Sequence, residues 1–419
     1  MSGHGPDPVK LDSAGREQGD IRMKAFKIAS LTGVAALSLA AAGAARADDT
    51  PPAAAAAPAA PAGPMALASP SMSASLSSNA DPLSADLGPL GKIWVSGQVT
   101  AFGMAQTAAG PPSEKRKGDI SNVQFEVQKT DGVFQFYVQA GDYNIPSLGT
   151  PVATSPRFTE ETYKYVPVAY IKIVPNAAFS FEIGELPTLI GAEYTFTFQN
   201  LNILRGLLWN QEPAISRGVQ ANYTKGPLAV SVSVNDGYFS EHYSTVSGLV
   251  TYTATMKDTI AVAASGNFDK TSRSTFVTPV AQNNGTVWNV MYTHTEDKWM
   301  VNPYIQYTTT PKDVSFGLPS SASTFGAAIL GKYSLTSMFN VAGRVEYISS
   351  SGSDVSLLYG PKSDAWSFTL TPTVQFKTYF VRAELAYVKV DGGAKGALFG
   401  AFANKDEQSR ALIETGVLF

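Results

Sequence analysis

The last twelve residues of the chain read QSRALIETGVLF, from Gln408 to Phe419. One face of this segment is largely apolar and consists of alternate residues, Ala411, Ile413, Thr415, Val417 and Phe419. Because successive side chains of a strand point to opposite faces, this pattern is typical of a strand with lipid on one side and a wet lumen on the other. We therefore predict the closing strand of a transmembrane β-barrel, with Phe419 and Val417 as the signal that barrel-assembly machinery recognises. An ordinary half-buried C-terminal strand is the alternative.

The beginning of the chain has the pattern of an export leader. A short basic start at residues 23–27 precedes an apolar run over residues 28–44, and residues 45–47 have the small-x-small form of a cleavage site. The run is too short and too rich in Ala and Gly for a retained transmembrane helix, which needs about 20 strongly apolar residues. We expect residues 1–22 to be a wrongly assigned upstream extension. Residues 23–47 are then a cleaved signal peptide that directs export. We expect the mature protein to be located in the bacterial outer membrane.

Residues 48–90 are rich in Ala, Pro and Ser, a composition that disfavours regular secondary structure. We expect a disordered, solvated periplasmic segment over this range. Two alternatives are open, namely a contact with peptidoglycan and partial entry of the segment into the pore.

The composition excludes several classes of function. The chain has no cysteine, so disulfides, thiolate nucleophiles and Cys-ligated metals are impossible. Charged residues make up 16% of the chain, against about 25% in ordinary soluble domains. A net charge of -3 without a basic stripe argues against nucleic acid as a partner. We expect neither a cofactor nor a metal site.

From residue 91 to residue 419 the chain repeats one pattern, in which about ten residues of alternating hydrophobicity are followed by a turn. About sixteen candidate strands follow from this pattern, joined by seven short connections and eight long ones. A barrel with short periplasmic turns, long outer loops and both ends in the periplasm needs one more long connection than short ones. The sequence therefore predicts an all-β fold over residues 91–419, a transmembrane antiparallel β-barrel of about sixteen strands.

The polar face of each strand is expected to line the lumen. In one strand, for example, Val123 and Phe125 alternate with Gln124 and Glu126. A charge on the lipid face near the midplane costs about 2–4 kcal/mol, so the charged face must be inside. The candidate pore-lining and constriction residues are Arg344, Glu346, Arg382, Glu384, Glu126, Lys172, Glu182 and Arg205.

Aromatic residues at the strand ends predict two interfacial girdles, because amphipathic rings prefer the level of the lipid headgroups. The girdle beside the short turns would hold Trp299, Tyr333, Phe339, Phe376 and Tyr379. The girdle beside the long loops would hold Tyr143, Tyr307, Tyr347, Trp366 and Tyr387.

The spacing Arg-x-Glu occurs twice, at Arg344 and Glu346 and again at Arg382 and Glu384. In one interpretation these rows form patches of opposite charge whose field biases ions in the pore. Neutralising both arginines would then move the reversal potential toward cation preference. In the other interpretation they are wall pairs that only satisfy each other.

One long connection, residues 188–214, is too apolar for a solvated loop. It contains Tyr194, Phe196, Phe198, Leu201, Ile203, Leu204, Leu207, Leu208 and Trp209. An apolar loop at a barrel rim is expected to fold inward, pack on the wall and narrow the pore. An outer lid or a contact between subunits is the alternative. Asn200 is expected to cap a short helix that carries Leu201, Leu204 and Leu208 on one stripe.

Several short motifs around this loop carry a family resemblance. They are Gly184-Glu185-Leu186-Pro187, Ile190-Gly191-Ala192-Glu193, Asn202, Arg205-Gly206-Leu207-Leu208 and Arg217-Gly218-Val219. With the alternating strand that follows, this arrangement resembles the OmpL-like beta-barrel porin family of Gram-negative bacteria over residues 91–419. The resemblance implies a passive diffusion channel and leaves the solute open.

The sequence favours a channel for small hydrophilic solutes, since about sixteen strands leave an aqueous interior. A structural or adhesive barrel with a plugged lumen is the first alternative, and a barrel hydrolase is the second. The hydrolase is disfavoured because neither His242 nor His294 lies near a nucleophile at a convincing spacing. We expect no enzymatic activity. The expected surroundings are outer-membrane lipid and lipopolysaccharide and, by analogy with barrels of this size, two further copies in a homotrimer.

Overall fold

The computed structural model of the protein describes residues 75–79, 81–275, 278–353 and 357–419. The expected upstream extension at residues 1–22, the expected signal peptide at residues 23–47 and residues 48–74 of the Ala/Pro-rich segment lie outside the described residues.

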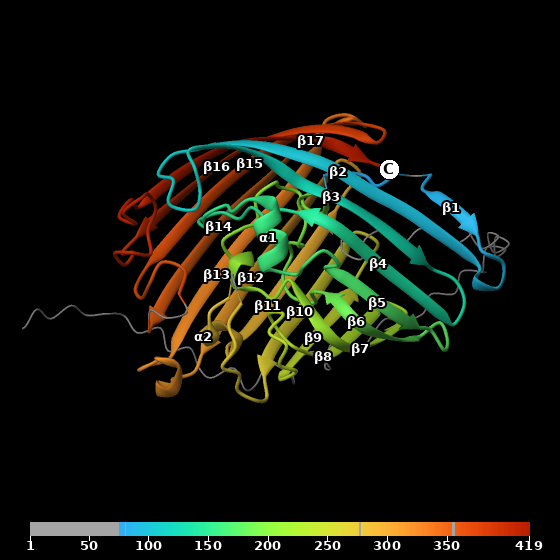
Figure 1. Ribbon diagram of the computed structural model, residues 1–419, viewed down its shortest axis with the longest axis horizontal. Coiled ribbons are helices and arrows are strands. Elements are labelled where there is room, and N and C mark those ends of the chain that lie inside the picture. The colour runs from blue at the N-terminus through green and yellow to red at the C-terminus, as the bar shows by residue number, and fades with distance from the viewer. Residues whose placement is uncertain (1–74, 80, 276–277, 354–356) are drawn as a thin grey trace, which may run out of the picture. The chain divides into compact units, whose positions relative to one another are not determined.

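The strands form one antiparallel sheet that closes on itself, as the tilted ribbons in Figure 1 show. Each strand from β2 to β17 pairs with its neighbours in sequence, and β17 pairs with β2 to close the barrel. The barrel therefore has 16 strands, as the sequence predicted. The first eight are β2 (Lys92–Gln106), β3 (Arg116–Lys129), β4 (Phe134–Tyr143), β5 (Val168–Ile173), β6 (Phe179–Pro187), β7 (Ile215–Lys225), β8 (Leu228–Asn235) and β9 (Thr245–Thr253). The last eight are β10 (Asp258–Asn267), β11 (Thr286–Thr295), β12 (Trp299–Thr310), β13 (Ala322–Ser334), β14 (Phe339–Gly352), β15 (Asp364–Phe376), β16 (Tyr379–Asp391) and β17 (Glu407–Leu418).

Short periplasmic turns alternate with long outer loops around the barrel. The turns are as short as residues 226–227 and 377–378, whereas the longest outer loop covers residues 188–214. The described parts of the outer loops contain α1 (Ser155–Glu161), α2 (Val280–Asn283), η3 (Thr197–Gln199), η4 (Trp209–Gln211) and η5 (Val314–Phe316). No helix in the described part of the chain is long and apolar enough to cross a membrane.

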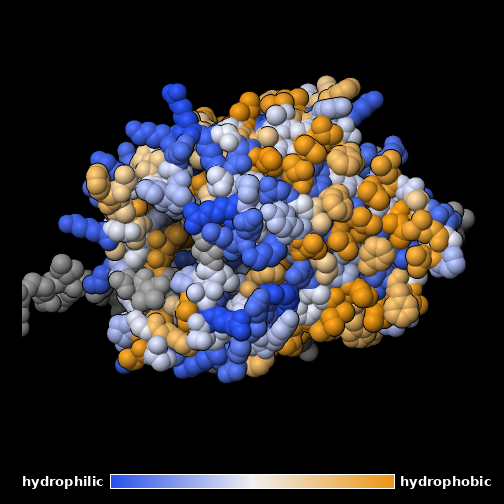
Figure 2. Space-filling model, in the orientation of Figure 1, coloured by the Kyte–Doolittle hydropathy of each residue, from blue (hydrophilic) through white to orange (hydrophobic). Residues whose placement is uncertain are grey.

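The alternation of the strands sorts their side chains between lipid and lumen. On β3, Val123 and Phe125 are 40% and 51% exposed, whereas Gln124 and Glu126 are 3% and 6% exposed. The exposed side chains are apolar and the enclosed ones polar, which is the reverse of a soluble protein and is typical of a barrel in lipid. Figure 2 shows hydrophobic residues covering much of the surface over the strands on the right of the view.

The predicted girdles form with one exception. Trp299, Tyr333 and Phe376 beside the turns are exposed on the lipid face, as is Trp366 beside the outer loops. Tyr143 was expected to join the outer girdle, but it is fully buried. The reason is its position in the alternation of β4, which directs the ring inward, where its hydroxyl lies 3.1 Å from that of Thr162.

The C-terminal residue completes the seam between β17 and β2. The amide of Phe419 donates to the carbonyl of Gly97, the amide of Gly97 donates back, and both distances are 2.8 Å. The phenyl ring lies directly over Gly97, where an added Cβ would approach the ring to 2.7 Å and the carbonyl of Gln124 to 2.8 Å. Phe419 and Ile413 lie on the exposed face, so the assignment of this face to lipid is confirmed.

A short extra strand extends this seam. Strand β1 (Leu83–Asp86) pairs with Lys92–Val95 of β2, beyond the point where β17 ends, and η2 (Gly88–Leu90) makes the turn. The start of β2 would otherwise leave backbone groups unpaired on that edge. Part of the range 48–90 therefore has regular structure, and the expectation of disorder up to residue 90 is wrong over residues 83–90.

We predict that the Phe419–Gly97 contact is needed for barrel closure. Deleting Phe419 removes two backbone hydrogen bonds and the ring that covers β2, and Gly97→Val places a branched side chain where the ring lies. Both changes should reduce the fraction of heat-modifiable barrel on unboiled gels. Gly118→Val is the matched control, since an added Cβ at Gly118 meets no atom within 4 Å. Unchanged assembly of both variants would contradict this role.

Candidate pore constriction and lumen

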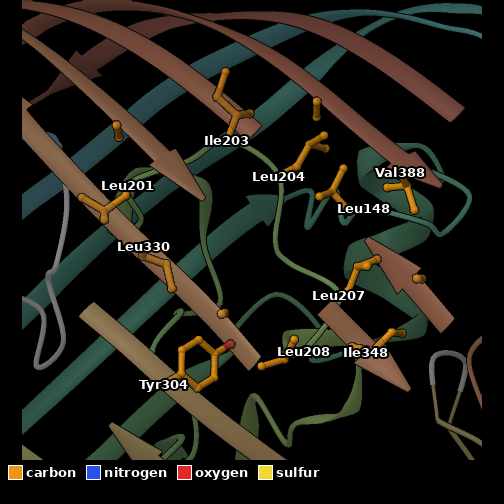
Figure 3. Close-up of a cluster of buried hydrophobic side chains, with 14 of the residues drawn as sticks. Leu148, Leu201, Ile203, Leu204, Leu207, Leu208, Tyr304, Leu330, Ile348 and Val388 are labelled. Atoms are coloured by element: carbon orange, nitrogen blue, oxygen red, sulfur yellow. The ribbon is translucent and has the colours of Figure 1, made fainter. Parts of the chain in front are cut away.

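The loop at residues 188–214 folds into the barrel and packs on its inner wall. The aliphatic side chains of Leu201, Ile203, Leu204, Leu207 and Leu208 are at most 2% exposed. Figure 3 shows them facing residues of the wall, and the same buried cluster contains Tyr304, Leu330, Ile348 and Val388. Full burial of one such side chain contributes about 1.5–3 kcal/mol, so this contact holds the loop inside. The prediction of inward packing is correct, and the alternative of an outer lid does not describe this loop.

The local structure of the loop differs from the prediction. No α-helix follows Asn200, and residues 201–208 have irregular backbone. The side chain of Asn200 instead closes a turn, because its Oδ1 accepts the amide of Tyr194 at 2.8 Å and its Nδ2 donates to the carbonyls of Tyr194 and Phe196. The predicted helix cap at Asn200 is therefore wrong, since tertiary packing on the wall replaced the periodicity of a helix.

An irregular loop inside a barrel leaves peptide groups that need partners, and carboxylates of the wall supply acceptors. Glu384 on β16 accepts the amides of Ile203 and Leu204, the latter at 3.0 Å. Glu346 on β14 accepts the amide of Leu208 at 3.2 Å. These two glutamates thus bind the backbone of the loop directly.

Arginines of the wall supply the donors. Arg382 on β16 donates to the carbonyls of Asn200 at 3.1 Å and Thr197 at 2.7 Å, and it forms an ion pair with Glu414 on β17 at 2.6 Å. The Arg382 and Glu414 side chains are both 0% exposed. Charge-assisted hydrogen bonds of this kind are about twice as strong as neutral ones, so the ion pair also fixes the loop.

Arg344 on β14 forms the second such centre. It pairs with Glu346 at 3.1 Å and with Glu193 of the loop, and it donates to the carbonyl of Leu204 at 2.9 Å. The side chains of Arg344 and Glu346 are both 0% exposed. The interpretation as a wall pair fits Arg344 and Glu346, which also hold the loop. It does not fit the second row, because Arg382 takes Glu414 as its ion-pair partner and Glu384 binds the loop backbone.

Arg205 lies in the loop itself and is completely buried. It donates to the carbonyls of Thr195, Asn202 and Ile203, all within the same loop. Burial lowers the pKa of its guanidinium to about 10, so the group stays charged near neutral pH. Its role is to close the loop on itself.

The other predicted lumen residues lie elsewhere on the wall. Glu126 on β3 is buried and accepts a long hydrogen bond of 3.4 Å from Ser96. Lys172 on β5 and Glu182 on β6 form an ion pair at 3.0 Å, with side chains 26% and 10% exposed. Lys172 and Glu182 therefore remain partly open to the lumen, unlike the pairs under the loop.

Sequence reasoning missed several residues of this centre. Glu414 belongs to the closing strand and lies directly across from Arg382 in the register of β16 and β17. Glu193 belongs to a quoted motif, and Arg410 binds the outer loop at residues 144–167 through the carbonyls of Ser147 and Thr150. The alternation of β17 marks Glu414 and Arg410 as lumen residues, so this signal was present in the sequence.

A cavity of about 520 Å³ remains between the loop and the wall of β5–β13, and its lining is partly apolar, with Leu249, Met300 and Leu330 among the apolar residues. Hydroxyl and amide side chains form most of its polar lining, and Lys172 and Glu182 are its charged residues. The polar lining residues are Tyr170, Ser180, Thr188, Tyr194, Gln220, Asn222, Thr224, Ser231, Thr251, Thr293 and Asn302. The lining of this cavity therefore carries no net charge, since Lys172 and Glu182 pair with each other.

Glu212 is an unusual member of the docked loop. It is 5% exposed, and neither carboxyl oxygen has a hydrogen-bond partner of ordinary geometry. Burial, followed by the nearby charges of Glu193 and Glu346, raises the pKa of Glu212 well above its ordinary value. Because an unpaired buried charge is costly, burial in the docked loop favours the protonated form of Glu212.

Each histidine among the described residues lies beside a carboxylate. His294 lies 2.7 Å from Asp258, and the hydroxyl groups that donate to Asp258 belong to Tyr292 and Thr255. His242 lies 3.9 Å from Asp269. Over the described ranges, no group of three or more His, Asp or Glu residues is arranged to hold a metal ion.

Sixteen tilted strands with an apolar outer face and an inward loop define an outer-membrane β-barrel of the porin type. The family model described as "Putative beta-barrel porin-2, OmpL-like" matches residues 92–419, and the chain belongs to this family. The resemblance found in the sequence is thereby confirmed. The chain matches no curated protein.

Solved structures of outer-membrane barrels have the same fold. An anion-selective porin from Comamonas acidovorans is similar with a TM-score of 0.57 and 9% identity, over 78% of this chain and 99% of that chain. OmpT of Vibrio cholerae, expressed in the outer membrane, is similar with a TM-score of 0.55 and 12% identity, over 81% of this chain and 100% of that chain. At these identities the likeness establishes the fold alone.

We predict that Gly206 is required for docking of the loop. An added Cβ at Gly206 would lie 2.2 Å from a carboxyl oxygen of Glu346 and 2.5 Å from one of Glu193. Gly206→Ala should therefore weaken docking by about 1–3 kcal/mol, the usual cost of overpacking. Protease cleavage within residues 196–212 measures this effect, with Gly118→Ala as the control in open space. Equal resistance of the two variants would show that the glycine is dispensable.

We predict that docking of the loop depends on pH through Glu212. Its pKa is raised in the docked state, so docking is most favourable below the ordinary value of 4.5 and weakens as the pH rises toward the raised pKa. Glu212→Gln should remove this dependence, because the amide is neutral at every pH. Cleavage of the loop by a protease active over a wide pH range, compared between wild type and variant, tests the sign. Tighter docking of the wild-type loop at alkaline pH would contradict it.

Proposed function

We propose that the protein is a porin, a water-filled channel through which small hydrophilic solutes diffuse passively across the outer membrane. The observation that carries this proposal is that the docked loop leaves a cavity beside it. The charged anchors of the loop lie on β14–β17, further hydrogen bonds come from Gln306 on β12 and Asn122 on β3, and the cavity of about 520 Å³ lies along β5–β13. A loop that narrows a barrel without filling it produces a size limit for solutes.

The lining of the cavity favours uncharged solutes with several hydroxyl groups. Hydroxyl and amide side chains donate and accept hydrogen bonds and so replace those that a solute loses with its water. Lys172 and Glu182 neutralise each other at 3.0 Å. The fixed charges of Arg344, Glu346, Arg382 and Glu384 lie under the loop, where we propose that they position the constriction.

A barrel with a plugged lumen is the second candidate. The observation that favours it is the extent of packing inside the barrel, where the loop forms a hydrophobic cluster with the wall. Such a barrel would serve a structural or adhesive role and would conduct no ions.

Other aspects of the function also remain proposals. We propose that the chain has no enzymatic activity, which membership of a porin family supports. A homotrimer is supported by one similar structure, OmpT of Vibrio cholerae in a trimer form, with a TM-score of 0.52 and 10% identity over 78% of this chain. Export by the signal peptide at residues 23–47, recognition of Phe419 and Val417 by assembly machinery and contacts with lipopolysaccharide stay predictions.

Conductance in a planar bilayer tests the channel directly. Deleting residues 198–209 removes the docked part of the loop, so single-channel conductance should rise and larger sugars should enter liposomes in a swelling assay. The barrel should stay heat-modifiable, because the deletion leaves all strands intact. The double variant Leu207→Ser and Leu208→Ser should change conductance in the same direction, since both side chains are 0% exposed in the docked loop.

The matched control is Phe402→Ser, which alters an outer-loop residue that is 86% exposed. It should leave conductance unchanged. If neither the wild type nor the deletion variant conducts ions after insertion into the bilayer, the proposal of a channel is rejected and the plugged barrel is favoured. Equal conductance of wild type and deletion would overturn the constriction while leaving the channel in place.

A further inference from the structure

The cavity beside the docked loop has two walls of different chemistry. Among the described residues that line it, those on β5–β8 are polar, apart from Pro187 at the end of β6. We call this group the polar wall, and its members are Tyr170, Lys172, Ser180, Glu182, Gln220, Asn222, Thr224 and Ser231. The lining on β9–β13 combines Thr251, Thr293 and Asn302 with a group that we call the apolar strip, namely Leu249, Ala261, Met291, Met300 and Leu330.

The apolar strip lies on the inward face of its strands, where a water-filled barrel usually has polar residues. On β9 and β10 the neighbours Val250 and Val262 are 44% and 42% exposed on the lipid face. Leu249 and Ala261 therefore point into the lumen. In the register of β10 and β11, Ala261 lies directly opposite Met291. The strip thus runs across neighbouring strands.

Docking of the loop uses only part of the strip. Met291, Met300 and Leu330 are at most 9% exposed and belong to the buried cluster that also contains Leu201 of the loop. Figure 3 shows Leu330 and Leu201 in this cluster. Leu249 and Ala261 are only half-buried, pack at the margin of the cluster and border the cavity. Packing of the loop therefore leaves apolar surface of the strip uncovered.

The polar wall is held in place by its own hydrogen bonds. Gln220 donates to Glu182 at 3.2 Å and to Asn222 at 2.8 Å. The hydroxyl of Ser231 also donates to Asn222, at 2.7 Å, and Lys172 pairs with Glu182 at 3.0 Å. Because each side chain positions the next, the wall presents a fixed set of donors and acceptors.

Two walls of opposite character define the kind of solute that fits between them. Hydroxyl groups on one edge of a solute replace their lost water on the polar wall, while an apolar face leaves water on the strip. A charged amphiphile would find no free counter-ion, because Lys172 and Glu182 already pair. A pyranose ring has hydroxyl groups around its edge and C–H groups on its faces, whereas an open-chain polyol has no fixed apolar face.

We propose that this cavity is a binding site for a pyranose sugar. The hydroxyl groups of the sugar bind the polar wall, and one face of the ring lies on Leu249 and Ala261. The flexible side chains of Met291 and Met300 adapt the strip to the shape of the ring. The cavity of about 520 Å³ lies within the usual range of sites for small molecules, about 300–1,000 Å³. The proposal rests on the channel function and names the class of solute that the channel prefers.

Blocking of the ion current by sugars tests the site in the intact protein. Glucose and sorbitol have the same number of carbon atoms, but only glucose forms the ring. In a planar bilayer, the concentration that halves the ion current should be at least about fivefold lower for glucose than for sorbitol. An equal or stronger block by sorbitol would overturn the sugar site and leave the channel in place. A wild type without conductance would overturn the proposed function, and the sugar site with it.

Variants of the strip test which residues make this distinction. Leu249→Asn keeps the size of the side chain and makes it polar, so the difference between glucose and sorbitol should fall to about twofold or less. Ala261→Ser should act in the same direction. Ala263→Ser is the matched control, because Ala263 lies on the same face of β10 but outside the cavity lining. An unchanged preference in Ala261→Ser and Leu249→Asn, with heat-modifiable barrels, would refute the role of the strip.

Discussion

The need of a buried, irregular backbone for hydrogen-bond partners governs the interior of this barrel. A loop of apolar side chains gains by leaving water, but its peptide groups lose their water at the same time. The lumen wall replaces many of those hydrogen bonds, together with Arg205 and Glu193 of the loop itself, since residues 201–208 form neither helix nor strand. The carboxylates of Glu346 and Glu384 and the guanidinium groups of Arg344 and Arg382 meet this need. The burial of the loop therefore depends on the presence of these charged groups on the wall.

This arrangement explains why most charged side chains of the lumen lie under the docked loop and few of them line the cavity beside it. Charges that bind a buried backbone must themselves be paired, because an isolated charge in such a site is costly. Four arginines are buried at and around the docked loop, Arg205, Arg344, Arg382 and Arg410, and five glutamates are buried with them, Glu193, Glu212, Glu346, Glu384 and Glu414. The charges of this group balance when Glu212 is in the protonated form, which its burial favours. The cavity beside the loop is left with hydroxyl, amide and apolar groups and with the Lys172–Glu182 pair, which is the physical basis for proposing neutral solutes.

Residues 75–77 and the docked loop contact each other inside the lumen, where Ser75 donates to the carbonyl of Leu201. The loop comes from between β6 and β7, whereas residues 75–77 precede β1 and bind Asn340 on β14 and Gln375 on β15. The position of the loop is therefore held by a segment ahead of the barrel as well as by the charges of the wall.

The sequence by itself determined the barrel, the order of its strands, the sense of its loops and the inward packing of residues 188–214. These features depend on local alternation and on the apolar content of one loop, both of which can be read along the chain. It also marked Lys172 and Glu182, Arg344 and Glu346 as lumen residues, because the face of a strand follows from its period.

Tertiary structure decided the rest. Arg382 pairs with Glu414, which lies across from it on the next strand, rather than with Glu384 two residues further along, because residues directly opposite in a sheet lie closest. Glu384 instead accepts backbone amides of a loop about 180 residues away, and the hydroxyl of Ser75 donates to the carbonyl of Leu201 in the same loop. Such pairings join segments that only the closed barrel brings together, and no pattern within a single strand encodes them.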